Sequence, residues 1–265
     1  MASINNYLFV TTVKKDVVAY LQEGKGEKAI VFVHGNLAGA IWWKKVLKYI
    51  PVGYKAYALD LPGNGQTPET GKRHTMEYLA EFLYDFVTSL KLSSFYLVGH
   101  SMGGGIAQLF TIMYGQMVKK LIIVNSMPMD GFPLLNGYGL DKLQSIMDNK
   151  DILRMALTAV LGRLADTEMY EEVICNAAKA SKQVVLEQPL TMCEANWSER
   201  IHLITCPTLS IHAEEDYFVP KEINLKTAHA IRNCTILLMK NTGHSPMIEA
   251  PREFTKIIMD FIEKG

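Results

Sequence analysis

Short apolar runs recur along the chain and are separated by segments with helical spacing. Such runs are typical of parallel strands that are buried on both faces of a sheet. Apolar residues between Met76 and Leu90 repeat at intervals of three and four, which predicts a helix over Thr75–Leu90. The pattern predicts an α/β protein whose buried strands are Ala29–Val33, Lys55–Leu59, a run starting at Phe95, Lys120–Val124, Thr208–Ile211 and Thr235–Met239.

The remaining elements follow from the same patterns. Alternating residues at Tyr7–Val13 and Asp16–Gln22 predict two strands joined by a turn. Helices are expected over Trp42–Tyr49, where Pro51 ends the element, over Ile106–Tyr114, and from Pro251 to the end of the chain.

The alternation of strands and helices lapses after Asn125 and resumes at Pro207. The intervening stretch has irregular, mostly helical patterning, with prolines and glycines near its start. We therefore expect residues 1–125 and 203–265 to form one core domain. Residues 126–202 are expected to form a helical insertion that lies over this core as a lid.

Composition narrows the possible functions. A chain of 265 residues suffices for one α/β domain, and its 49% hydrophobic and 20% charged residues are typical of a globular protein. The 27 basic and 27 acidic residues cancel, so nucleic-acid binding has no electrostatic support. No apolar run is long enough for a membrane span, and the start of the chain lacks the pattern of a secretory signal. We expect a cytoplasmic protein; its oligomeric state does not follow from the sequence.

The cysteines give no sign of a metal site or a disulfide framework. Cys175, Cys193, Cys206 and Cys234 are scattered and lack the C-x-x-C spacing that zinc sites use. We expect thiols in a reducing compartment and no bound metal.

The candidate chemistry begins at the end of the run that starts at Phe95. Gly99, Ser101 and Gly103 fit the pattern G-x-S-x-G, in which a strand ends, the chain turns sharply and a helix begins. Such a turn exposes the serine hydroxyl and leaves no room for side chains at the flanking glycines. Ser101 is therefore the candidate nucleophile.

A serine hydroxyl needs a base and an acid that orients the base. In this type of site the acid precedes the histidine along the chain. Asp216 follows the strand Thr208–Ile211, and His244 follows the strand Thr235–Met239. The carboxyl ends of strands gather at one edge of an open sheet, so we expect Ser101, Asp216 and His244 to form a catalytic triad.

At this point the chain resembles the α/β-hydrolase-fold serine enzymes. Four motifs carry the resemblance: His34-Gly-Asn36, the turn Asp60-Leu-Pro-Gly-Asn-Gly65, the serine turn and Gly243-His244. Many relatives have histidine where this chain has Asn64, in a turn that is structural in the family. The resemblance implies an α/β-hydrolase fold, a mostly parallel sheet with flanking helices, and a helical cap after the sixth strand.

Two further groups of residues are candidates for binding. The N–H groups of Met102 and Asn36 are expected to form the oxyanion hole, with Leu37 as the fallback for Asn36. A small, apolar acyl substrate would contact aromatic and methionine side chains. The candidates are Trp42, Met127, Phe132, Tyr138 and Trp197.

These residues predict a hydrolase that splits a carboxylic ester, thioester or lactone without a cofactor. An acyl transferase or a lyase on the same triad stays open, as does a ligand-binding receptor of the same fold. An aminopeptidase would need acidic side chains in the cap to hold a substrate amine, and Glu168, Glu171, Glu172 and Glu194 are available there.

Overall fold

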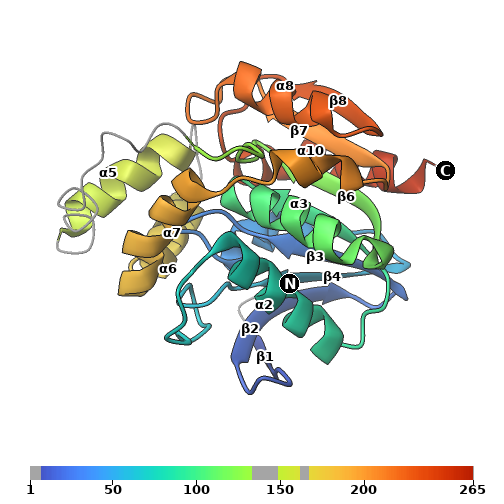
Figure 1. Cartoon of the computed structure of the whole chain (residues 1–265). Coiled ribbons are helices and arrows are strands. Elements are labelled where there is room, and N and C mark those ends of the chain that lie inside the picture. The colour runs from blue at the N-terminus through green and yellow to red at the C-terminus, as the bar shows by residue number, and fades with distance from the viewer. Residues whose placement is uncertain (1–6, 133–148, 162–166, 265) are drawn as a thin grey trace.

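The computed structural model describes residues 7–132, 149–161 and 167–264 (Figure 1). Within these ranges, eight strands form one sheet in the order β1-β2-β4-β3-β5-β6-β7-β8. β2 is antiparallel to β1 and to β4, whereas all other neighbouring strands are parallel. The predicted, mostly parallel sheet is thus confirmed. Its strands are β1 Leu8–Thr11, β2 Val17–Gly24, β3 Lys28–Val33, β4 Tyr54–Leu59, β5 Phe95–His100, β6 Val118–Val124, β7 Thr208–Ala213 and β8 Cys234–Met239.

The helices follow the strands in the order expected. They are α1 Lys44–Leu47, α2 Met76–Ser89, α3 Met102–Tyr114, α5 Lys150–Leu161, α6 Thr167–Ala177, α7 Lys182–Glu194, α8 Lys221–Ala230, α9 Pro246–Glu249 and α10 Pro251–Glu263. Short 3-10 turns are η1 Ala40–Trp43, η2 Gly115–Met117 and η4 Ser198–Leu203. In the part of the chain that is described, no helix is long and apolar enough to cross a membrane.

Local signals explain two of these helices. Thr75 caps α2 because its hydroxyl accepts a hydrogen bond from the N–H of Tyr78 at 3.1 Å. The continuous helix predicted over Trp42–Tyr49 is wrong in detail, since a 3-10 turn there precedes a single turn of α1. Pro51 shortens the element because the residue before a proline disfavours the helical conformation.

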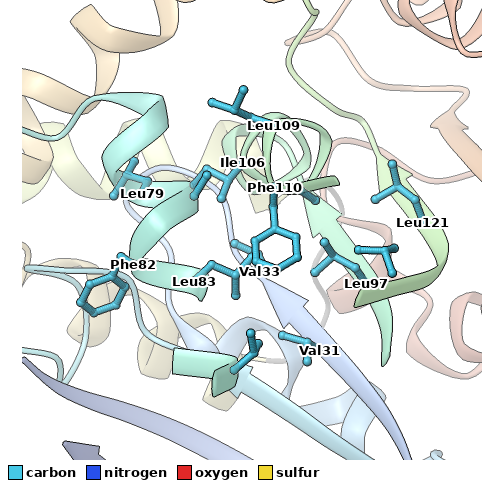
Figure 2. Close-up of a cluster of buried hydrophobic side chains, with 14 of the residues drawn as sticks. Val31, Val33, Leu79, Phe82, Leu83, Leu97, Ile106, Leu109, Phe110 and Leu121 are labelled. Atoms are coloured by element: carbon cyan, nitrogen blue, oxygen red, sulfur yellow. The ribbon is translucent and has the colours of Figure 1, made fainter. Parts of the chain in front are cut away.

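Two apolar layers enclose the sheet, and alternate residues of each strand belong to different layers. In β3, Val31 and Val33 belong to the cluster under α2 and α3, whereas Ile30 and Phe32 belong to the cluster under α1 and α10. Figure 2 shows the first cluster, in which the side chain of Phe110 lies over β3 and β5. Burial on both faces explains why these strands are continuously apolar.

The chain order creates a switch point between β3 and β5. From β3 the chain moves to β4 on one side, and from β5 it continues through β6 and β7 on the other. Val33 pairs with Gly99, so the segments that follow these two residues leave the sheet side by side. Ligands of open α/β sheets bind at such points.

The inserted helices α5, α6 and α7 come between β6 and β7. Figure 1 shows them grouped at the left of the sheet. α5 and α6 contribute buried apolar side chains to the cluster under α1, among them Leu153, Leu157, Met169 and Val173. Whether the expected boundaries at residues 126 and 202 delimit a lid stays a prediction.

Phe110 offers a test of the core. We expect Phe110→Ala to lower the free energy of unfolding by about 3 to 5 kcal/mol, because a fully buried ring is replaced by a cavity. Urea denaturation followed by circular dichroism measures this change. Phe9→Ala is the control, since Phe9 is 59% exposed and should change stability by less than about 1 kcal/mol. Equal effects of the two variants would contradict the assignment of the core.

Candidate active site

Ser101 lies at the turn between β5 and α3, in a strained conformation. Its φ of 53° and ψ of −120° place a non-glycine residue in the region that L-amino acids rarely adopt. Surrounding hydrogen bonds hold it there: its N–H donates to the Val124 carbonyl at 3.0 Å, and its own carbonyl accepts from Gly104 at 2.9 Å and from Met127 at 3.0 Å. The strain is thus imposed by β6 and the first turn of α3.

Steric contacts explain why glycine occupies several positions in and beside this turn. A Cβ at Gly99 would collide with the carbonyl of Gly103, and a Cβ at Gly103 would collide with the carbonyls of Val33 and His34. A Cβ at Gly35 would lie 3.0 Å from the Cβ of Ser101. The loop after β3 therefore lies directly against the serine turn.

His244 and Asp216 form a buried pair. Nδ1 of His244 lies 2.9 Å from Oδ2 of Asp216, and the two residues are 6% and 7% exposed. The other carboxylate oxygen of Asp216 accepts from the N–H groups of Phe218 at 2.8 Å and Val219 at 3.1 Å. This carboxylate fixes the neutral imidazole with its proton on Nδ1, which leaves Nε2 as a base.

The backbone of His244 is anchored from two sides. Its carbonyl accepts from Nε2 of His100 at 2.8 Å and from the Asn125 amide at 2.9 Å, while the Asn125 carbonyl oxygen accepts from Ala213 at 2.8 Å. Asn125 itself adopts a φ of 41°. The Asn125 side chain, which follows β6, therefore joins the end of β7 to the loop that carries His244.

His100 packs against the ring of His244. Its ring centroid lies 4.8 Å from that of His244, and His100 directly precedes Ser101. Burial, together with the nearby His244, lowers the pKa of His100 well below its usual value. His100 is therefore neutral at pH 7 and acts as a hydrogen-bond donor to the histidine loop.

The loop after β3 is organised by His34. The fully buried ring of His34 lies with Nδ1 at 2.7 Å from the Gly35 carbonyl, and Nε2 accepts from the N–H of Leu61 at 3.0 Å. Burial lowers the pKa of His34 to about 4, so the ring stays neutral. Among the described residues, the backbone N–H groups of Asn36 and Met102 donate to no acceptor.

The Asn36 side chain is directed toward α7. Its Nδ2 donates to Oε1 of Gln188 at 2.9 Å and lies 3.4 Å from the carbonyl of Val184. Leu37, the fallback donor, has a φ of 55°, so the loops after β3 and β5 each contain a non-glycine residue with a positive φ. Neither α7 contact is visible as a sequence motif, because Asn36 and Gln188 are separated by 152 positions.

The expected substrate contacts fall in different environments. Trp42 is 2% exposed and stacks against His100 at 6.1 Å. Met127 and Trp197 occupy positions of core residues: both are buried in the cluster under α3, and the Trp197 indole donates to Gln108. Their contact with substrate stays a prediction, as does that of Trp42.

The other two candidates differ again. Phe132 is partly buried against the same cluster and borders a concavity of about 260 Å³ that does not include the His244–Asp216 pair. Tyr138 lies outside the described residues.

The acidic residues proposed for an amine substrate are mostly paired with cations. Glu172 accepts from Lys44 at 2.7 Å, and Glu171 from Arg154 at 2.6 Å. Glu194 binds Arg73 at 2.9 Å. Three of the four carboxylates considered are thus already neutralised. In the described part of the chain, no cluster of three or more His, Cys, Asp or Glu side chains is suited to a metal ion.

Asp60 is the most perturbed carboxyl near these loops. It is fully buried at the end of β4, and its oxygens accept from the N–H groups of Ala40 at 2.6 Å and Gln66 at 2.8 Å. Burial raises the pKa of Asp60 to about 7, although the two N–H donors oppose the change. Gly65, at a φ of 55°, leaves the space that this carboxyl fills.

Comparison with known proteins places the chain among hydrolases. Residues 28–170 match the family described as alpha/beta hydrolase fold. A 2-hydroxy-6-oxononadienedioate/2-hydroxy-6-oxononatrienedioate hydrolase from Cupriavidus pinatubonensis is 25% identical over 267 residues, which cover 90% of this chain and 88% of the relative.

Solved structures show the same fold. A thermophilic esterase from Thermogutta terrifontis aligns with a TM-score of 0.84 at 22% identity, over 97% of this chain and 98% of the esterase. The enol-lactonase from Burkholderia xenovorans aligns with a TM-score of 0.85 at 17% identity, over 97% of this chain and 100% of the lactonase. At these identities the likeness establishes the fold alone.

Asp60 predicts a pH-dependent stability. Its pKa is higher in the folded state than the unfolded value of about 4, so its stabilising contribution is present below about pH 4 and is lost as the pH rises to about 7. Relative to Asp60→Asn, the wild type should lose stability over this range, by on the order of 4 kcal/mol. Urea denaturation at several pH values measures the difference.

Comparing the wild type with Asp60→Asn isolates the effect of Asp60, because the side-chain amide of asparagine does not titrate. Any offset that the amide causes is the same at every pH, and other titrating groups cancel between the two proteins. A difference in stability that stays constant between pH 4 and pH 8 would show that Asp60 has an ordinary pKa.

Proposed function

The chain belongs to the alpha/beta hydrolase fold family, and on this premise we propose that it is a serine hydrolase that cleaves a carboxylic ester, thioester or lactone through an acyl-serine intermediate. One observation carries the proposal. The buried His244–Asp216 pair, at 2.9 Å, packs against His100, which directly precedes the strained Ser101. A residue at an ordinary helix N-terminus would need neither the strain nor the pair.

In the first step, Oγ of Ser101 attacks the carbonyl carbon of the substrate while Nε2 of His244 takes the hydroxyl proton. Asp216 keeps the other ring nitrogen protonated and stabilises the imidazolium that forms. The carbonyl π electrons move to oxygen, and the N–H groups of Met102 and Asn36 are proposed to bind this oxyanion. Both N–H groups are without an acceptor among the described residues, which supports this role.

In the second step, the oxyanion collapses and the bond from the acyl carbon to the leaving group breaks. His244 returns its proton to the leaving oxygen or sulfur, and the acyl group stays on Ser101. Water then enters, gives a proton to His244 and attacks the acyl carbon. The bond from the acyl carbon to Oγ of Ser101 breaks, His244 returns the proton to Oγ, and the carboxylic acid is released.

The inserted helices are proposed to cover this site. Support comes from the contact of α7 with Asn36, which brings residues of the insertion to the loop beside Ser101. A substrate would then lie between the insertion and the carboxyl ends of β3 and β5. Trp42, Phe132 and Tyr138 are the side chains proposed to contact it.

A second candidate reaction comes from the relatives. The compound named for the Cupriavidus pinatubonensis hydrolase is a keto dicarboxylate without an ester, so its hydrolysis must break a carbon–carbon bond. The same triad can serve such a reaction. The cations Lys44, Arg73 and Arg154, which lie in or against the insertion, are each paired with glutamate, so these three offer no free charge to a carboxylate of a substrate. We therefore place ester cleavage first.

Ser101→Ala tests the proposed nucleophile. We expect loss of turnover by at least about 10⁴-fold on a panel of p-nitrophenyl esters, acyl-thioesters, lactones and a 2-hydroxy-6-oxo-dienoate, because no other group can form the acyl intermediate. A fluorophosphonate probe should label the wild type at residue 101 and leave the variant unlabelled. Tight ligand binding without product in the wild type would instead support a receptor.

Asp216→Asn tests the orienting acid. We expect kcat to fall by about 10⁴-fold, since the amide favours the wrong imidazole tautomer. Glu214→Gln is the matched control in the same loop. Among the described residues, the Glu214 side chain accepts only from the N–H of Asn241, at 3.4 Å, and the variant should stay within about twofold of the wild type. Steady-state kinetics on the best ester of the panel would contradict the assignment if both variants lost activity equally.

A further inference from the structure

A series of hydrogen-bonded side chains, buried at its centre and partly buried at its ends, links the loop beside Ser101 to a second histidine–carboxylate pair. Nδ2 of Asn36 donates to Oε1 of Gln188 at 2.9 Å, and Nε2 of Gln188 lies 3.3 Å from Nδ1 of His74. Nε2 of His74 lies 3.1 Å from Oε1 of Glu69. Asn36, His74 and Glu69 belong to the core, whereas Gln188 belongs to α7. This series of hydrogen bonds crosses the boundary between the core and the insertion twice.

The hydrogen bonds of this chain have one consistent direction. Glu69 can only accept when ionised, so His74 carries its proton on Nε2 and presents Nδ1 as an acceptor. Gln188 must then turn its NH2 group toward His74 and its carbonyl toward Asn36. The carboxylate thus determines which way the Gln188 amide points, and Gln188 determines which way the Asn36 amide points.

The anion at the end of the chain is itself held in place. Oε2 of Glu69 accepts from the hydroxyl of Ser181 at 2.6 Å. Partial burial by itself raises the pKa of Glu69, but the Ser181 hydroxyl and the His74 ring outweigh this and lower it. The backbone of His74 is fixed as well, because its N–H donates to Glu187 at 2.9 Å.

Burial at its centre makes this series of hydrogen bonds rigid. His74 and Gln188 are both 0% exposed, so water cannot replace a missing partner without rearrangement. Asn36 is the end of this chain that lies beside the serine turn. Its neighbour Leu37 has a φ of 55°, a conformation that relaxes unless surrounding contacts hold it.

We propose that Gln188 is a positioning residue that acts through Asn36: oriented by the His74–Glu69 pair, it holds the loop after β3 so that the Asn36 N–H faces the developing oxyanion. This inference rests on the proposed function, because it assigns a role in oxyanion binding. It gives α7 a part in catalysis that is separate from covering the substrate.

Two substitutions at the same position separate positioning from packing. Gln188→Leu keeps a similar volume but removes the acceptor of Asn36. Gln188→Glu keeps an oxygen that can accept from Asn36, but it adds a charge at a buried position. If Gln188 only fills space, the apolar leucine should be tolerated better than a new buried charge. If it positions Asn36, kcat should follow the opposite order.

We expect Gln188→Leu to lower kcat by about 10-fold to 100-fold with KM within about twofold, which is less than the loss of a whole oxyanion donor. Gln188→Glu should lower kcat by no more than about threefold. Steady-state kinetics on p-nitrophenyl acetate measures both, and thermal unfolding checks that each variant is folded. An equal kcat in wild type and Gln188→Leu, or a larger loss in Gln188→Glu, would overturn the role.

A double-mutant cycle tests the path through Asn36. Asn36→Ala combined with Gln188→Leu should be no slower than the slower single variant, since both remove the same link. Additive losses would show that Gln188 acts elsewhere. The control is Arg73→Gln, which removes an exposed ion pair between the core and α7 and should leave kcat within twofold.

The outcomes also distinguish this role from the proposed function. Turnover in the wild type that persists in Ser101→Ala would refute the proposed function and, with it, the positioning role. Turnover that is lost in Ser101→Ala but is equal in Gln188→Leu and wild type would refute only the role of Gln188.

Discussion

The close contact of two backbone turns, one after β3 and one after β5, is the constraint on which the site depends. Gly35 approaches Ser101 within the space of one missing Cβ, and Gly103 approaches the carbonyls at the end of β3. The parallel register of Val33 with Gly99 brings the two turns to the same level of the sheet. Any side chain at these glycines would separate the loop that is proposed to bind the oxyanion from the serine.

The loops that carry Asp216 and His244 reach the same edge because β6, β7 and β8 continue the sheet in order beyond β5. Asn125 and His100 then fasten the His244 carbonyl to neighbouring strand ends. Each group that faces the proposed nucleophile is thus supported by a buried polar partner. Such preorganisation is the main source of catalytic power in sites of this kind.

The sequence was sufficient for the parts that rest on local pattern. Buried parallel strands are continuously apolar, and the serine turn, Asp216 and His244 each follow such a strand, so their loops could be placed in advance. The partners of these loops could not. Asn125 and Gln188 belong to no sequence motif, because the partners of Asn125 lie 88 and 119 positions away and those of Gln188 lie 114 and 152 positions away. Met127 and Trp197 are residue types that often line substrate pockets, yet both are buried by packing under α3, as core residues are.

The three inserted helices are attached to the core by different forces. α5 and α6 contribute apolar side chains, and each also makes a polar contact with the core: the Val160 carbonyl accepts from Ser245, and Glu172 accepts from Lys44. α7 is attached by directional hydrogen bonds: Ser181 binds Glu69 and the Gly63 carbonyl, and Gln188 binds His74 and Asn36. Hydrogen bonds at its N-cap and near its middle thus fix the orientation of α7 against the core. Under the proposed function, α7 therefore serves as part of the frame that holds the loop after β3.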